Sequence, residues 1–215
     1  MPLMDPETQQ QVREILAAVK LPVTLKMFTQ DFECGYCGET RQIAEEVAEL
    51  SDLVRLEVHD FVADGKLGKS LGVDKIPAIV VLGDGGHDYG IRFFGIPSGY
   101  EFTSLLEAIV LVGTGDVELH NSTRRFLDAL HAPLHLQVFV TPTCPYCPRA
   151  VVLAHQLAYA SDKVTADMVE VSEFPHLGQK YNVMGVPRTV INEHVYLEGA
   201  APEQMLLEKL KAAVR

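Results

Sequence analysis

The sequence predicts an α/β protein built as two tandem units, each a mixed four-stranded sheet flanked by helices. The first observation behind this prediction is an internal repeat. Cys34 and Pro77 lie 43 positions apart, and Cys144 and Pro187 are separated by the same 43 positions. Between these landmarks the two halves align without a gap at an offset of 110 residues, which unrelated segments would not show. The second observation is that short β-rich runs alternate with helical patterns in each half, as in units that fold around one sheet.

We expect the first unit over residues 1–114 and the second over residues 115–215, with a hinge in the Gly-containing segment 111–116. The first unit opens with a helix, for which Asp5 is a candidate N-cap and Pro6 suits the first helical position. One face of this helix is apolar, at Val12, Ile15, Leu16 and Val19. The same stripe returns in the second unit at Phe126, Leu127 and Leu130.

Each unit then follows one order of elements. A β-rich run leads into a Cys-x-x-Cys motif, a helical pattern follows, and a strand and a short helix come next. The short helices end at Gly72 and Asn182, residue types that tolerate the left-handed conformation after a helix. A strand that starts after a proline, a hairpin strand and a terminal helix close each unit. The runs are 23–28, 38–50, 54–61 and 78–82 in the first unit and 134–139, 148–160, 166–174 and 188–192 in the second.

The composition is that of a globular protein, with 47% hydrophobic and 22% charged residues among 215. No apolar run reaches the roughly 18 residues that a membrane span needs, and the first residues lack the basic and apolar regions of a secretory signal. We therefore expect a cytoplasmic protein without membrane association, in a compartment where thiols are kept reduced. The net charge of −11 argues against a nucleic-acid partner, which would require a basic face. Asn occurs only three times, a weak sign of a thermophilic source.

The four cysteines form two Cys-x-x-Cys motifs, CGYC at 34–37 and CPYC at 144–147. In disulfide exchange a thiolate is the nucleophile, and a second thiol close by resolves the mixed disulfide. The start of a helix supplies unpaired backbone N–H groups that stabilise the thiolate of the first cysteine. These requirements predict two redox-active pairs. The attacking thiols are Cys34 and Cys144, and the resolving thiols are Cys37 and Cys147.

A single zinc ion bound by all four cysteines and two structural disulfides are the alternatives. Zinc ribbons separate their two Cys-x-x-Cys pairs by roughly 15–20 residues, whereas Cys37 and Cys144 are 107 positions apart. Structural disulfides are uncommon in the reducing cytoplasm. The redox interpretation is therefore favoured, with no metal and no cofactor other than the redox-active disulfides themselves.

These motifs carry a resemblance to known proteins. Each half resembles a thioredoxin-fold unit, and CPYC with a later Val-Pro is similar to glutaredoxins. The tandem arrangement, with one Cys-x-x-Cys in each half, resembles the protein disulfide oxidoreductase family of thermophilic archaea and bacteria over nearly the whole chain. The resemblance implies a cytosolic enzyme that reduces, forms or rearranges protein disulfides. It also implies re-reduction by a thioredoxin reductase-like flavoenzyme or by small thiols.

The resemblance further implies that the peptide bonds before Pro77 and Pro187 are cis. It would place Ile76 and Val186 beside the two disulfides, where their backbone groups bind a substrate in extended form. Substrate contact and packing against the sheet edge are equally open roles for the aromatic residues within the motifs, Tyr36 and Tyr146.

The chain departs from the thioredoxin pattern at two places. Thioredoxins carry Trp before the first cysteine, whereas this chain has no Trp and has Glu33 and Thr143 there. The buried Asp of thioredoxin, on the strand before the active site, has no acidic counterpart, because Phe28 and Val138 stand six residues before each cysteine. This departure argues against a proton relay through a buried carboxylate on that strand.

Charge differs between the two motifs. Residues 1–115 contain nine Lys and Arg against 18 Asp and Glu, whereas residues 116–215 contain nine against 11. The acidic residues near Cys34 are Asp31, Glu33 and Glu39, and the basic residues near Cys144 are Arg149 and Arg188. A like charge disfavours a thiolate and an opposite charge favours it. We therefore hypothesise that Cys144 has the lower thiol pKa and that its pair is the more oxidising.

Two functions of other kinds remain open. One is a peptide-binding isomerase or chaperone, in which the prolines and an apolar groove matter more than turnover. The other is an electron-relay module that feeds a peroxidase, like the tandem domains at the front of peroxide-reducing flavoenzymes. Such modules use one Cys-x-x-Cys, and no flavin domain follows the repeat in this sequence, so we expect this role less.

Overall fold

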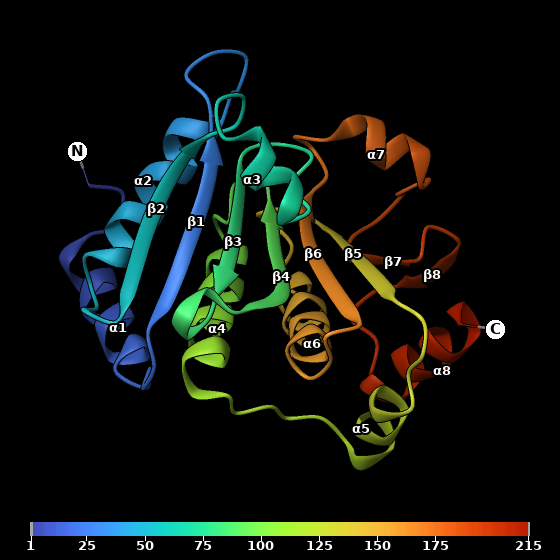
Figure 1. The fold of residues 1–215 in the computed structure, drawn as a ribbon. Helices are drawn as coiled ribbons and strands as arrows, with labels where there is room; N and C mark the ends of the chain where they lie inside the picture. Colours follow the sequence, from blue (N-terminus) through green and yellow to red (C-terminus); the bar gives the residue numbers. More distant parts are fainter. Residues whose placement is uncertain (1, 215) are drawn as a thin grey trace.

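The structure is a computed structural model that describes residues 2–214. The eight strands of this range form one sheet in the order β2-β1-β3-β4-β6-β5-β7-β8 (Figure 1). Each half supplies a mixed four-stranded part of it, as the repeat predicted. The strands of the first half are β1 (Val23–Thr29), β2 (Val54–Asp60), β3 (Ala78–Leu82) and β4 (Asp88–Phe94). Those of the second half are β5 (Leu134–Val140), β6 (Val164–Glu170), β7 (Arg188–Ile191) and β8 (Val195–Glu198).

Helices cover both faces of this sheet, and a short 3-10 helix (Asp84–Gly86) joins β3 to β4. The longer helices pack on one face: α1 (Pro6–Leu16), α2 (Cys37–Ala48), α4 (Glu101–Thr114), α5 (Asn121–Asp128), α6 (Cys147–Tyr159) and α8 (Glu203–Ala213). Two short helices pack on the other face, α3 (Gly65–Ser70) and α7 (Pro175–Lys180).

The residues predicted to cap helices are found at helix ends in the structure. The Asp5 carboxylate accepts a hydrogen bond from the Thr8 N–H at 2.7 Å, which confirms the predicted N-cap of α1. Gly72 and Asn182 have φ angles of +71° and +50°, so both residues after the short helices adopt the left-handed conformation expected of them.

The two halves are joined edge to edge. β4 pairs in parallel with β6, with Ile91 opposite Ala166 and Phe94 opposite Val169; we call this pairing the seam. The repeat alone did not predict it. A free strand edge leaves a row of N–H and C=O groups unpaired, and the seam satisfies that row for both strands. The division of the chain at 114/115 stays a prediction, since α4 ends at Thr114 but the sheet continues across the seam.

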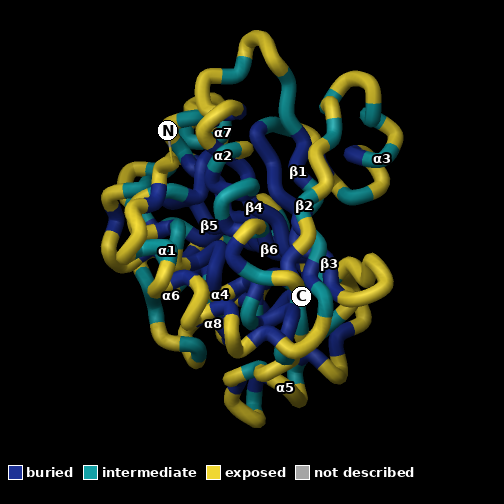
Figure 2. Tube along the Cα trace, turned by 90° about the vertical axis from the view of Figure 1, so that its left-hand side faces the viewer, coloured by how far each residue is buried: buried dark blue, intermediate teal, exposed yellow. Residues whose placement is uncertain are grey.

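Burial distinguishes the seam strands from their repeat equivalents. Residues 90–94 of β4 and 166–170 of β6 are all buried. Their equivalents β8 and β2 form the outer edges of the sheet and are largely exposed or half-buried, as Figure 2 shows for β2. The two copies of the repeat therefore diverged in polarity where one pairs with the other.

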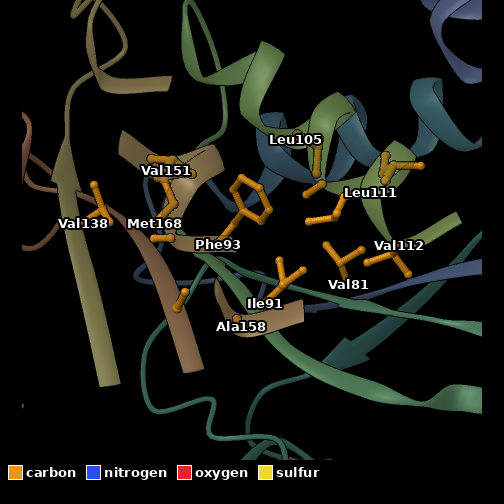
Figure 3. Packing of buried hydrophobic residues seen from close by; sticks show 14 of the residues in the cluster. Val81, Ile91, Phe93, Leu105, Leu111, Val112, Val138, Val151, Ala158 and Met168 are labelled. Atoms are coloured by element: carbon orange, nitrogen blue, oxygen red, sulfur yellow. The ribbon is translucent and has the colours of Figure 1, made fainter. Parts of the chain in front are cut away.

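One hydrophobic core runs across the seam on the face of the longer helices (Figure 3). Phe93 of β4 is fully buried there, in one cluster with Leu105 of α4, Val151 of α6 and Met168 of β6. Its ring meets the His155 ring edge-on, with the ring centres 5.0 Å apart. Because side chains of both halves share this core, we expect the halves to unfold together.

Both Cys-x-x-Cys motifs lie at one edge of the sheet, the edge formed by the ends of the strands and not by the outer strands β2 and β8. β1, β2, β4, β5 and β6 all run in the same direction, while β3 and β7 run antiparallel to their neighbours. The motifs follow β1 and β5, so both stand where these strands end. Pro77 and Pro187 precede β3 and β7 and therefore lie at the same edge.

Replacing Phe93 by Ala should lower the free energy of unfolding by about 3–5 kcal/mol, because a fully buried ring at the seam is lost. Urea denaturation followed by circular dichroism and tyrosine fluorescence should show one coincident transition for wild type and variant. Val62→Ala, at a side chain that is 71% exposed, is the control and should change stability by less than about 0.5 kcal/mol. Two separate transitions in the wild type would contradict a shared core.

Candidate active sites

The four cysteines form two disulfides, Cys34–Cys37 and Cys144–Cys147, each with its Cα atoms 5.5 Å apart. Cys37 is the first residue of α2 and Cys147 is the first residue of α6. The other cysteine of each pair stands in the loop just ahead of the helix, where unpaired backbone N–H groups point. Each pair is closed within its own half, so the four sulfurs do not form one ligand set.

Exposure differs within each pair and between the pairs. Cys34 is half-buried and Cys144 is 7% exposed, whereas Cys37 and Cys147 are 3% and 0% exposed. In both sites the first cysteine is thus the one that an incoming substrate reaches. This order supports the predicted roles of attacking and resolving thiol. The CPYC site is the more enclosed of the two.

The peptide bonds Ile76–Pro77 and Val186–Pro187 are both cis, as the resemblance implied. Phe28 near the end of β1 pairs with Ala78, the residue after Pro77, and the two sites repeat this construction. The Pro77 carbonyl accepts the Gly95 N–H at 2.9 Å, and the Pro187 carbonyl accepts the Gly199 N–H at 2.8 Å. Substrate binding by the backbone of Ile76 and Val186 stays a prediction.

The aromatic residues of the motifs are open to solvent, with Tyr36 48% and Tyr146 72% exposed. Exposure of this extent favours substrate contact over packing for both rings. Two further exposed apolar side chains, Phe32 and Met184, stand two residues before Cys34 and two residues before Val186. Nothing in the sequence pattern marks these two residues, because an apolar residue in a loop carries no periodic signal.

The charged residues predicted to tune the thiols differ in their surroundings. The Arg188 guanidinium forms an ion pair with Glu198 across the β7–β8 pair and lies 4.6 Å from the centre of the Tyr196 ring. This pairing reduces the positive field that Arg188 can exert on Cys144. Arg149 and Glu33 are exposed, and neither takes part in an ion pair among residues 2–214.

A buried carboxyl group that the sequence analysis missed lies near the CPYC site. Phe28 and Val138 are buried apolar residues, so the strand before each motif indeed lacks an acid. Glu101, however, is fully buried in the first turn of α4, and burial raises its pKa to about 7. One carboxyl oxygen accepts from the Ser104 hydroxyl at 2.7 Å, and the other has no hydrogen-bond partner among residues 2–214. The preceding residue, Tyr100, donates its N–H to the Pro142 carbonyl at 2.9 Å, two residues before Cys144.

A carboxyl group of the second half, that of Glu173, crosses the seam in the opposite direction. Glu173 accepts the Ile96 N–H at 2.6 Å, and its own N–H donates to Glu170 at 2.7 Å. Burial and the charges of Glu170 and Glu39 raise the pKa of Glu173 to about 7. Glu39 follows Cys37 by two residues, so this carboxyl of the second half belongs to the surroundings of the CGYC site. Only the seam brings these acids together, which is why spacing along the chain could not reveal them.

The described residues contain neither a cluster that could bind a metal ion nor a helix that could span a membrane. Among residues 2–214, no three His, Cys, Asp or Glu side chains gather in a way that could hold a metal ion. Within the same range, no helix has the length and apolar character that crossing a membrane requires.

Comparison with known proteins extends over the whole chain. The structure superposes on the protein disulfide oxidoreductase of Aeropyrum pernix with a TM-score of 0.91 and 29% identity, covering 98% of this chain and 93% of the other. It superposes on the alkylhydroperoxide reductase protein AhpF of Enterococcus faecalis with a TM-score of 0.89 and 30% identity, covering 96% and 99%. The chain belongs to the tandem thioredoxin-fold proteins that include the AhpF protein of Enterococcus faecalis. A thioredoxin-domain family model also matches residues 134–212.

Curated relatives of this family member include larger proteins. The AhpF protein of Staphylococcus epidermidis is 30% identical over 125 residues, which are 58% of this chain and 24% of that protein. The Pseudomonas putida protein of the same name is 24% identical over 208 residues, 97% of this chain and 37% of that protein. The chain thus spans about a quarter to a third of the length of these relatives.

The raised pKa of Glu101 makes stability depend on pH. The folded protein holds a proton up to about pH 7 that a free Glu releases near pH 4.5, so this contribution is complete below pH 4.5 and is lost as the pH rises through 7. Between pH 5 and pH 8 the free energy of unfolding of the oxidised protein should therefore fall by about 2 kcal/mol more than that of Glu101→Gln. Urea denaturation at both pH values measures it. Glu107→Gln, at an exposed position of the same helix, should keep the wild-type dependence; equal slopes for all three proteins would contradict the assignment.

Proposed function

We propose that the protein reduces, forms and rearranges protein disulfides through two dithiol sites. The observation that carries the proposal is the repeated construction of each site. In both, a disulfide at a helix start has its more exposed cysteine first and lies at the sheet edge where a cis-proline strand begins. The likeness to the protein disulfide oxidoreductase of Aeropyrum pernix supports the same activity.

The exchange at the CPYC site proceeds in two steps. The Cys144 thiolate attacks one sulfur of the substrate disulfide, which forms a mixed disulfide and releases the other substrate sulfur as a thiolate. The Cys147 thiolate then attacks the Cys144 sulfur, closes the Cys144–Cys147 disulfide and releases the second substrate sulfur. Two electrons pass from the protein to the substrate, whose two thiolates take up protons. Substrate oxidation is the same path reversed, and Cys34 with Cys37 follows it at the other site.

The resolving step requires that a buried thiol lose its proton. Cys147 is fully buried, and burial disfavours its thiolate. Glu101 supports this step as the proton acceptor, because its pKa of about 7 lets it take up and release a proton near neutral pH. It stands next to Tyr100, which is hydrogen-bonded to the loop of Cys144. The carboxyl group would thus replace the acid that is absent from the strand before the motif.

Substrate binding is proposed at the sheet edge around each disulfide. The backbone groups of Ile76 and Val186 precede strands β3 and β7 and can pair with an extended substrate segment. Exposed apolar side chains surround this edge: Phe32 and Tyr36 at the CGYC site, Tyr146 and Met184 at the CPYC site. Such a surface suits an unfolded or flexible protein chain that presents a disulfide.

A second candidate function is an electron relay toward a peroxidase. The AhpF relatives favour it, since 97% of this chain aligns with a part of the Pseudomonas putida alkyl hydroperoxide reductase protein that makes up 37% of that protein. In either function the electrons would come from a thioredoxin reductase-like flavoenzyme or from small thiols, and the protein would act in the cytoplasm. The cofactor set would be the two disulfides alone.

Insulin reduction by dithiothreitol tests the activity. Cys34→Ser and Cys144→Ser should each retain part of the wild-type rate, because the other site remains intact. The double variant should fall to the uncatalysed rate. A double variant that still accelerates the assay, or a wild type that suppresses aggregation without any reduction, would assign the protein to the peptide-binding chaperone class instead.

The order of the two thiol pKa values follows from the charges around them. In proteins that lack the other pair, Cys144 should show the lower thiol pKa, measured by ultraviolet absorbance of the thiolate against pH. Arg149→Gln should raise it. Arg188→Gln should change it less, because Glu198 already pairs with that guanidinium. A lower thiol pKa at Cys34 than at Cys144 would refute this electrostatic assignment.

A further inference from the structure

Each Cys-x-x-Cys helix borders a groove, and the two grooves are repeat equivalents. The CGYC groove, about 450 Å³, lies between the N-terminal segment, α2 and the loop before α4. The CPYC groove, about 870 Å³, lies between the segment 116–120, α6 and the start of α8, with α4 as an added wall. Three lining positions correspond at the offset of 110: Glu39 and Arg149, Ile43 and Leu153, Glu46 and Gln156.

In both grooves a backbone N–H of the segment before the first helix is hydrogen-bonded to the Cys-x-x-Cys helix. The Met4 N–H donates to the Glu46 carboxylate at 2.9 Å, and the Glu118 N–H donates to the Gln156 side-chain oxygen at 2.9 Å. In each half the segment before the first helix is thus fixed to the equivalent position of the Cys-x-x-Cys helix. The grooves are therefore a repeated feature of the fold beside each disulfide.

The charge nearest each disulfide is opposite in the two grooves. Glu39 and Arg149 each stand five residues after the first cysteine, and both are exposed. Neither forms an ion pair among residues 2–214. A carboxylate is favourable in the first turn of a helix, but a cation there opposes the helix dipole. Arg149 therefore does not stabilise α6 in this position, and no partner within the described chain accounts for it.

The CGYC groove combines an apolar lining with acidic surroundings. Its lining is mainly apolar, with Ile96 and Phe102 opposite α2. The ionisable groups around it are acidic, since Asp31 and Glu33 are exposed in the loop of Cys34 and the charge of Glu39 reaches Glu173. An apolar side chain flanked by a cationic one complements this groove.

The CPYC groove has Arg149 at the end near the disulfide and carboxylates at the other end. Arg149 and Gln156 are seven residues apart on α6, which corresponds to about 10 Å. Two acidic lining residues lie at the far part: Glu118, whose N–H donates to Gln156, and Glu203, which lies beside His120; Glu107 and Asp116 also line the groove. A substrate residue close to the reacting cysteine therefore meets Arg149 before it meets Glu118 or Glu203.

We propose that the two active sites select substrates of opposite charge. Glu39 binds a Lys or Arg side chain that flanks the reacting cysteine of substrates of the CGYC site, and Arg149 binds an Asp or Glu side chain that flanks the cysteine in substrates of the CPYC site. This specificity rests on the proposed disulfide exchange. Of the three equivalent lining positions, the pair Glu39 and Arg149 is the one that is charged in both grooves, and the two charges are opposite. Substrates of opposite charge account for this difference.

The test uses short peptides whose single cysteine is held in a disulfide with 5-thio-2-nitrobenzoate, which absorbs visible light when it is released. One peptide carries Lys and the other Glu within two residues of the cysteine. With the CPYC cysteines replaced by Ser and the protein reduced beforehand, the second-order rate constant of chromophore release should be about fivefold higher for the Lys peptide. With the CGYC cysteines replaced, it should be about fivefold higher for the Glu peptide. Both preferences should fall toward unity in 1 M NaCl, where exposed charges are screened.

Charge reversal at the two positions is the decisive variant pair. Glu39→Arg should invert the preference of the CGYC site, and Arg149→Glu should invert that of the CPYC site. The conservative variants Glu39→Asp and Arg149→Lys should each keep the wild-type preference of their site. Glu49→Arg at the end of α2 and Lys163→Glu before β6 are exposed, line neither groove and give the matched controls. They should leave each ratio within about twofold.

The ratio of two peptides at one site separates this inference from the proposed function. Both peptides have the same cysteine and leaving group, so differences in thiol pKa between the sites cancel. If both sites release the chromophore but the ratios stay near unity, charge selection is overturned and disulfide exchange stands. If neither site reacts with the peptides or with uncharged 2-hydroxyethyl disulfide, both proposals fail. Should a reversal variant not fold, the salt dependence of the wild-type ratios still decides.

Discussion

The parallel pairing of β4 with β6 is the interaction on which the rest of the structure depends. It turns two four-stranded sheets into one, and it is supported by a core in which Phe93 is fully buried. Because the seam strands run in the same direction, the ends that carry both motifs fall at one edge of the sheet. The seam also brings groups of one half to the site of the other. Glu101 of the first half stands by the loop of Cys144, and Glu173 of the second half binds the backbone of Ile96.

The two copies of the repeat kept their chemistry and diverged in their surroundings. Each retains a disulfide at a helix start and a cis-proline at the same edge. At the seam, the segment before α4 contacts the CPYC loop, where Gly99 approaches the Pro142 carbonyl so closely that a Cβ atom would clash with it. Cys144 in this loop is 7% exposed, whereas Cys34 is half-buried. One duplicated site has therefore become enclosed and the other has stayed open.

Sequence spacing predicted what is local or exactly repeated. The repeat predicted the elements and the cysteine pairs, the residue types at the helix start predicted the N-cap at Asp5, and the resemblance implied the cis bonds before Pro77 and Pro187. It did not predict the seam, because strand pairing between copies depends on edges that a single unit leaves free. Glu101 escaped notice because it is 43 residues before Cys144 and in the other half. The pairing of Arg188 with Glu198 was within reach, since a β7–β8 hairpin register places the two residues opposite each other.

Carboxyl groups cross the seam in both directions, so each half contributes an acid to the surroundings of the other half's motif. A half that lacked its partner would expose the buried residues 166–170 of β6 or 90–94 of β4, and each site would lose an acid whose pKa of about 7 depends on burial at the seam. A carboxyl group released to water returns toward its ordinary pKa and no longer exchanges protons near neutrality. A disulfide exchange that uses these carboxyl groups as proton acceptors would therefore depend on the contacts that also stabilise the sheet. Glu39 and Arg149 are exposed and belong to neither hydrophobic cluster, so their charges can differ without disturbing the core.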